Sequence, residues 1–238
     1  MSWYQSSTLT VAESPATERA AFLRKTYGLV ALAIAAFVGL EAILLSLPGV
    51  EALVQKFFFA SRIGWFGVMV VFMAGSYAAQ YMAANPSSTG LQYAGLSLMV
   101  VLQSLIFLPL LFIASKYFGF EVIAKAAIIT GVVFGGLTAT VLLTGRDFSF
   151  LGGAVAVMSF GALAIMVVSM FMGGGLGIWF AFLMVAIMSA AILYQTSVIQ
   201  TQYPTTMYVA AAVALFASIM TLFWYVLQIV MSSSRSQN

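Results

Sequence analysis

The chain has 238 residues, of which 63% are hydrophobic and only 6% are charged. A soluble domain carries about 25% charged residues, so this chain has too few charges to cover a globular surface in water. We therefore expect a protein embedded in a lipid bilayer. The net charge of +3 is not gathered into a basic tract, which excludes a nucleic-acid-binding surface.

Two missing residue types exclude most membrane enzymes, because the sequence contains no Cys and no His. Without cysteine there is no disulfide, no thiolate nucleophile and no Cys-ligated metal. Without histidine there is no Ser–His dyad, no zinc motif of the HExxH type and no His-ligated haem. We therefore expect no catalytic residues, no metal site and no cofactor.

Apolar runs divide the rest of the chain. Residues 1–22 are polar and predict a mobile tail, in which an interfacial helix can form toward Arg24. Residues 23–231 predict a transmembrane domain, and residues 232–238 a second polar tail. At 1.5 Å per residue, each run is long enough to cross a hydrocarbon core of about 30 Å. The first run is too long for a signal peptide and is expected to be retained. The fold class is thus an all-α integral membrane protein with seven spans, at about 27–47, 63–83, 93–114, 122–143, 148–170, 178–198 and 206–231.

Short turns join the spans. Pro48 and Gly49 end the first run, and Pro86 lies in the turn after the second. Asp147 follows a tight turn and is expected to be the N-cap of the fifth span. Gly173 to Gly175 separate the fifth span from the sixth.

Lysine and arginine are almost evenly divided between the two sides of the membrane, so orientation rests on the first helix. Its basic cluster, Arg24 and Lys25, is N-terminal, which favours a cytoplasmic N-terminus. An odd number of spans then places the C-terminus outside.

Polar side chains interrupt the last two spans, at Gln195, Thr196 and Ser197 in the sixth and at Ser218 and Thr221 in the seventh. Such residues usually face the interior of a helix bundle, because lipid offers them no hydrogen-bond partner. We therefore expect contacts between these two helices.

Several stretches resemble motifs of one membrane protein family. They are Phe22-Leu-Arg-Lys-Thr-Tyr27, Ala84-Asn-Pro86, Phe134-Gly-Gly-Leu-Thr138 followed by Thr144-Gly-Arg-Asp-Phe-Ser-Phe-Leu-Gly-Gly153, and Tyr194-Gln-Thr-Ser197. In this order they cover nearly the whole chain from Phe22 onward. Together they resemble the Bax inhibitor family, the transmembrane Bax-inhibitor-motif proteins, and in particular its bacterial-type members.

The resemblance implies six helices around a central seventh. It also implies a pH-sensitive calcium leak, described for some members, in which two Asp residues on the sixth and seventh helices sense protons. The matching positions here hold Gln195 and Ser218. Two neighbouring carboxylates share a proton and attract a divalent cation, whereas Gln and Ser can only hydrogen-bond. We therefore interpret Gln195, Ser218, Thr196 and Thr221 either as an ion pathway or as a neutral clasp between these helices.

Three further residues are candidate titratable or latch groups. Glu41 lies within the first span, where an ionisable residue suggests a function, although it is also close enough to the helix end to reach the lipid headgroups. Arg62, at the mouth of the second span, is its candidate partner. Asp147 is explained by helix capping alone.

Two functions from different classes remain open. The first is a calcium leak channel, or a regulator of ion homeostasis, whose paired-Asp sensor has been replaced. The second is a non-transporting interaction protein that modulates a membrane-anchored AAA quality-control protease or a stress response. The resemblance implies such a protease partner for bacterial relatives, with the N-terminal tail involved. Either function places the chain in a lipid bilayer, and we expect the bacterial inner membrane.

Overall fold

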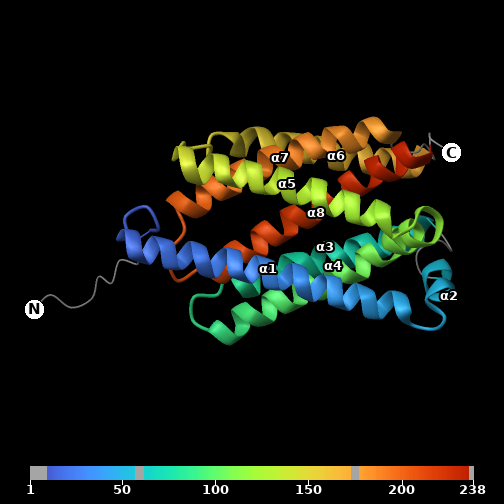
Figure 1. Ribbon diagram of the computed structural model, residues 1–238, viewed down its shortest axis with the longest axis horizontal. Helices are drawn as coiled ribbons and strands as arrows, with labels where there is room; N and C mark the ends of the chain where they lie inside the picture. Colours follow the sequence, from blue (N-terminus) through green and yellow to red (C-terminus); the bar gives the residue numbers. More distant parts are fainter. Residues whose placement is uncertain (1–9, 57–61, 173–176, 236–238) are drawn as a thin grey trace, which may run out of the picture.

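The computed structural model describes residues 10–56, 62–172 and 177–235, and within them it is built from helices (Figure 1). Seven of these helices are long and apolar enough to cross a membrane, which confirms the expected fold class. The helices are α1 (Ala16–Ser46), α2 (Val50–Val54), α3 (Arg62–Ala83), α4 (Thr89–Ile113) with a π-helical turn (Ala114–Phe118), α5 (Phe120–Thr144), α6 (Leu151–Met172), α7 (Gly177–Thr201) and α8 (Tyr208–Arg235).

Helices dominate because lipid cannot hydrogen-bond to the peptide groups, so each span must satisfy its own backbone. The helices end where a residue cannot continue the right-handed conformation. Gly119 before α5 and Gly145 after it have φ angles of 83° and 62°, in the region that favours glycine. The backbone N–H of Gly145 donates to the carbonyl of Val141, as in a regular helix C-cap.

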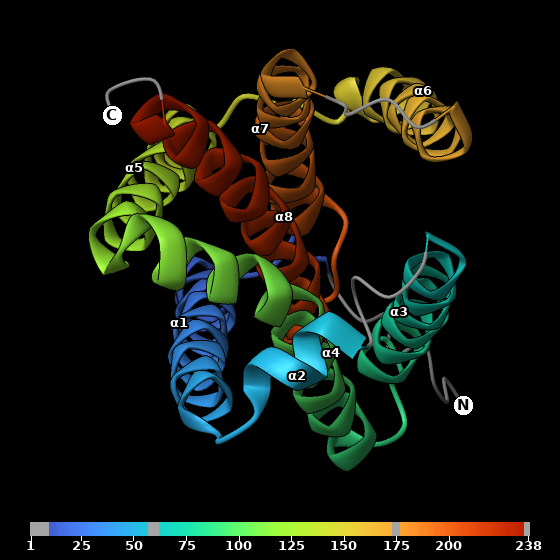
Figure 2. The ribbon, with the colours of Figure 1, turned by 90° about the vertical axis from the view of Figure 1, so that its right-hand side faces the viewer.

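The last helix, α8, is the centre of the bundle. α1, α3, α4, α5 and α7 all pack against it, and 78% of its most apolar stretch is buried. α6 instead packs against α7, and only 6% of its most apolar stretch is buried. Figure 2 shows α8 between its neighbours and α6 at the edge. The central seventh helix is therefore confirmed, with α6 as the outermost of the six around it.

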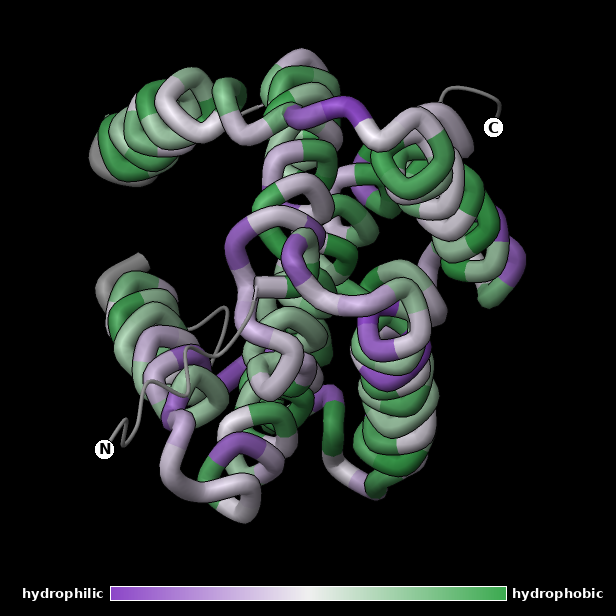
Figure 3. Tube along the Cα trace, turned by 90° about the vertical axis from the view of Figure 1, so that its left-hand side faces the viewer, coloured by the Kyte–Doolittle hydropathy of each residue, from purple (hydrophilic) through white to green (hydrophobic). Residues whose placement is uncertain are grey.

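Aromatic rings fill the contact between α4 and α8. The ring of Phe107 stacks on that of Phe223 with 5.7 Å between centroids, and it meets Trp224 edge-on at 5.0 Å. Phe37 of α1 adds a further edge-on contact with Phe107 at 5.3 Å. Figure 3 shows the hydropathy of the residues along the chain. The flanks of the helices are largely hydrophobic, and hydrophilic residues gather mostly at turns and helix ends. This distribution suits a protein with lipid around it.

The structure describes the expected N-terminal tail from residue 10 onward, and there it is folded against the bundle. α1 begins at Ala16 rather than near Tyr27, and both Val11 and Phe22 are buried. The backbone N–H of Val11 donates to the carbonyl of Tyr203 at 2.9 Å, which holds this segment against the link between α7 and α8. Apolar side chains among polar neighbours anchor the segment, although its composition suggested a tail. The expected glycine break at 173–175 lies outside the described residues.

Candidate functional site

The polar residues of α7 and α8 meet inside the bundle. The hydroxyl of Ser218 donates a hydrogen bond to Oε1 of Gln195 at 2.9 Å. Gln195 lies six residues before the end of α7 and Ser218 ten residues after the start of α8, so the pair lies about 9 to 15 Å below the same end of the bundle. Neither group carries a charge, so the contact is a neutral bond between the central helix and its neighbour.

Three hydroxyls from three helices meet at Thr196, the residue that follows Gln195 in α7. Those of Tyr27 on α1, Thr138 on α5 and Thr196 on α7 are close enough to interact, yet each is buried without meeting the geometry of a hydrogen bond within the described residues. Unsatisfied buried hydroxyls that converge in this way commonly hold an internal water molecule. The sequence marked Thr196 as a polar residue within a span, whereas Tyr27 and Thr138 lie in stretches that resemble family motifs.

Thr221 does not join this group. Its hydroxyl donates to the carbonyl of Ala217 in its own helix at 2.9 Å, which is the usual arrangement for a threonine within a helix. The structure therefore joins two of the four expected polar residues, Gln195 and Ser218, by a hydrogen bond. Thr196 instead faces the hydroxyl of Tyr27, and Thr221 is bonded to its own helix. Their part in ion passage stays a prediction.

Asp147 joins the loop between α5 and α6 to α7 instead of capping a helix. α6 begins at Leu151, three residues later than an N-cap at Asp147 requires, so the expected capping role was wrong. One oxygen of Asp147 accepts from the backbone N–H of Ser149 at 2.8 Å and from the hydroxyl of Ser197 at 2.9 Å. The Ser197 hydroxyl also accepts from the backbone N–H of Phe148 at 2.9 Å. This network fastens the α5–α6 loop to α7.

The electrostatics of the loop follow from these bonds. The backbone N–H and the side chain of Ser149, and then the Ser197 hydroxyl, hold the pKa of Asp147 below its usual range. The Asp147 side chain is exposed, so water screens part of this effect. Ser197 is two residues from Gln195 and therefore lies on another face of α7. The loop network and the Gln195–Ser218 bond are thus separate contacts of one helix.

Glu41 lies far from this group, toward the other end of α1. Fourteen residues separate it from Tyr27, or about 21 Å along the helix. Its side chain is only 4% exposed, and neither carboxylate oxygen has a hydrogen-bond partner within the described residues. The carboxylate therefore stays inside the bundle and does not reach the headgroups. The side chain of Arg62 lies outside the described part of the chain, so their pairing stays a prediction.

The geometry of these groups offers no dense acidic site. Among the described residues, no three acidic side chains gather closely enough to hold a metal ion. A calcium site normally uses six or more oxygen ligands, several of them carboxylates. What the interface between α7 and α8 does offer is a hydrogen-bonded pair of neutral polar groups, Gln195 and Ser218.

Comparison with known proteins adds a family assignment. A family model described as "Inhibitor of apoptosis-promoting Bax1" matches residues 19–235. An uncharacterized protein of Pseudomonas aeruginosa is 34% identical over 213 residues, which cover 87% of this chain and 87% of the relative. No solved structure matches the chain.

Proposed function

The chain belongs to the Bax inhibitor family, and from this premise we propose that it passes calcium ions, or regulates ion homeostasis, without the family's acidic pH sensor. It is an integral membrane protein with seven apolar helices. The proposed ion route runs along the interface of α7 with α8, where Gln195 and Ser218 occupy the positions that match the family's two Asp residues.

One observation carries this proposal, the hydrogen bond from Ser218 to Gln195 at 2.9 Å. Two carboxylates at these positions would share a proton and change their charge with pH. The amide and the hydroxyl do not titrate in the physiological range, so their bond holds α7 to α8 at any ordinary pH. A neutral pair also attracts a divalent cation less than an anionic pair does.

The neighbouring hydroxyls support a route at this place. Tyr27, Thr138 and Thr196 are buried and unsatisfied within the described residues, in a bundle whose other interior contacts are largely apolar. Leaving such groups without a partner is costly in an apolar interior, so water between them would lower the free energy of the folded state. Since Thr196 follows Gln195 in α7, a hydrated segment here would lie at the level of the Gln195–Ser218 bond along that helix, as a leak controlled by this bond requires.

Restoring the acidic pair tests the proposal. We expect liposomes that contain the Gln195→Asp, Ser218→Asp double variant to take up calcium at a rate that depends on pH between about 6 and about 8, because the carboxylates exchange a shared proton. The unmodified protein should show a smaller uptake with little pH dependence. A calcium-sensitive dye inside the liposomes measures both rates.

A double variant with Gln195→Asn and Ser218→Asn is the matched control. Asn has the shape of Asp but no charge, so this variant should show no pH dependence if the carboxylates act through ionisation. Strong pH-gated uptake by the unmodified protein would contradict the loss of the sensor. It would instead assign the titration to another acid, with Glu41 as the first to replace.

The neutral pair also favours the second function, an interaction protein that modulates a membrane-anchored AAA quality-control protease. A chain without the acidic sensor lacks the groups that would gate calcium passage. Absence of calcium uptake by the unmodified protein and by both double variants would support this alternative. The folded position of residues 10–22 leaves less free chain for a protease to grasp than the sequence suggested. Unchanged turnover of the protease's substrates in cells that lack this protein would remove the alternative.

A further inference from the structure

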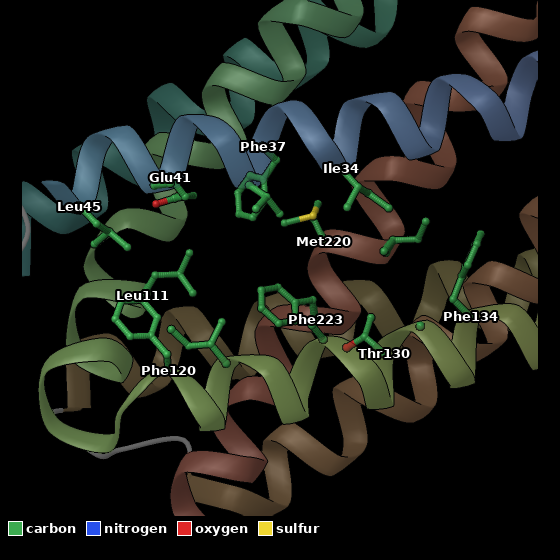
Figure 4. A pocket seen from close by; sticks show the side chains of 16 residues that line it. Ile34, Phe37, Glu41, Leu45, Leu111, Phe120, Thr130, Phe134, Met220 and Phe223 are labelled. Carbon is green, nitrogen blue, oxygen red and sulfur yellow. The ribbon is translucent and has the colours of Figure 1, made fainter.

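An apolar cavity lies between α1 and α5, apart from the site described above. Its volume is about 420 Å³, within the range of small-molecule pockets. Figure 4 shows α1 on one side of the cavity and α5 on the other, with α8 contributing Met220 and Phe223. Most of the lining is aliphatic or aromatic, so the cavity accepts an apolar molecule rather than a string of waters.

The cavity opens sideways, toward the lipid. α1 and α5 meet at Tyr27 and Phe134, whose ring centroids are 6.5 Å apart, and both helices pack on α8. Farther along α1 the two rims of the cavity include Val38 and Phe120, which are 58% and 70% exposed. Since both residues belong to helices that are long and apolar enough to cross a membrane, a molecule dissolved in the bilayer can enter between the two helices.

The carboxyl group of Glu41 is the one ionisable group in the lining of the cavity. It is 4% exposed, and both of its oxygens lack a partner among the described residues. The other polar side chain of the lining, Thr130, already donates its hydroxyl to the carbonyl of Ala126 at 2.8 Å. No Lys or Arg of the described chain lines the cavity. The cavity thus presents a single acceptor group that is costly to leave unpaired.

This combination selects the chemistry of the occupant. A metal ion would need several oxygen ligands, and the cavity offers one free carboxylate. A primary amine with one alkyl chain matches both parts of the site, because its ammonium donates to a carboxylate and its chain fills apolar space. We propose that the cavity binds a single-chain lipophilic amine, which enters from the bilayer between α1 and α5 and places its nitrogen against Glu41. This proposal is independent of calcium transport.

Decylamine and decanol form a matched pair of probes, alike in chain length and different in the head group. We expect decylamine to bind saturably to the full-length protein in phosphatidylcholine nanodiscs, measured by isothermal titration calorimetry with empty nanodiscs subtracted. The Glu41→Gln variant should bind decylamine at least about tenfold more weakly, since a hydrogen bond to a charged group is lost. Decanol should bind both proteins alike.

Two further variants separate the cavity from general effects of charge and folding. Glu51→Gln removes an exposed carboxylate at the same end of the bundle, and it should leave decylamine binding unchanged. Gly131→Phe places a ring at the lining, where an added Cβ meets no atom within 4 Å, and it should abolish saturable binding of both probes. Equal affinities for the two probes in the unmodified protein, or for decylamine in the protein and in Glu41→Gln, would overturn the proposal.

Discussion

Asp147 shows how one exposed carboxylate joins two elements. It accepts hydrogen bonds from Ser149 and Ser197, and these bonds lower its pKa. A carboxylate whose pKa is lowered by folding stabilises the folded state at pH values above its unfolded pKa, about 4. That contribution is lost as the pH falls through the lowered pKa of the folded state. Above this range, the ionised group holds the α5–α6 loop against α7.

We therefore expect Asp147→Asn to lower the melting temperature slightly at neutral pH and to have no effect in strong acid. Asn still accepts the bonds but without the negative charge that strengthens them. Thermal unfolding of the detergent-solubilised protein across the acidic range measures the difference. Ser149→Ala keeps the backbone donor and removes only the side-chain one, so it should cause a smaller loss with the same dependence on pH. A difference between Asp147→Asn and the unmodified protein that persists at every pH would exclude ionisation as its cause.

Two polar side chains of α1, Tyr27 and Glu41, have buried oxygens without a hydrogen-bond partner among the described residues, and their surroundings differ. Tyr27 faces hydroxyls of α5 and α7, whereas Glu41 faces an apolar cavity. An unpaired hydroxyl costs less to bury than an unpaired carboxylate. One water molecule would therefore satisfy the hydroxyl of Tyr27, whereas the carboxylate of Glu41 needs a cationic partner or a proton.

At the scale of elements, the closest helix contact is that of α3 with α4. A Cβ built at Gly95 would lie 2.5 Å from the carbonyl oxygen of Ala79 and 2.7 Å from the backbone nitrogen of Ala83. Real Cβ atoms do not come this close to backbone atoms, so only glycine allows the two helices to approach in this way. Small residues at such crossings are the usual basis of helix packing in membranes.

We expect Gly95→Ala to destabilise the protein by about 1 to 3 kcal/mol, because the methyl group forces α3 away from α4. Gly90→Ala is the matched control on the same helix. Its added Cβ would have only the Ser88 hydroxyl within 4 Å, at 3.9 Å, and the change should stabilise α4 slightly. Denaturant unfolding in detergent compares the two. Equal stabilities would show that α3 and α4 separate without cost.

At the scale of the whole molecule, the central position of α8 explains why the bundle is one unit. Five other spans pack on α8, and residues near the start of α1 are fastened to the link before it. α6 is the exception, since within the described residues it packs mainly against α7, and the loop network of Asp147 fastens the turn before it. Figure 1 shows the N-terminal and C-terminal ends of the bundle on opposite sides, as seven spans require.

This arrangement predicts which end of the bundle faces the cytoplasm. Because the sequence contains no cysteine, single introduced cysteines can test the prediction. Ser87 lies in the turn between α3 and α4, at the end of the bundle where α1 begins, and Ser232 lies near the end of α8. In intact cells, we expect a membrane-impermeant maleimide to label Ser232→Cys and to label Ser87→Cys only after permeabilisation. The reverse pattern would invert the proposed orientation, and labelling of both in intact cells would contradict seven spans.

The sequence alone determined the features that a bilayer imposes on each segment separately. The number of spans and their approximate positions follow from the length of each apolar run, because a bilayer of given thickness demands a given length of helix. The motifs from Phe22 to Ser197 resembled those of the Bax inhibitor family, and the family model confirms it. The polar residues Gln195 and Ser218 stood out because lipid offers them no partner.

Only the tertiary structure decided which groups meet. Local sequence does not reveal that Ser197 holds Asp147, that Tyr27 joins Thr138 and Thr196, or that Val11 is buried. These contacts join positions far apart in the chain, and a helix that is apolar all round gives little sign of which face turns inward. The same reason applies to Glu41: its sequence position allowed the headgroups or the interior, and the packing of α1 and α5 on α8 placed it in a cavity.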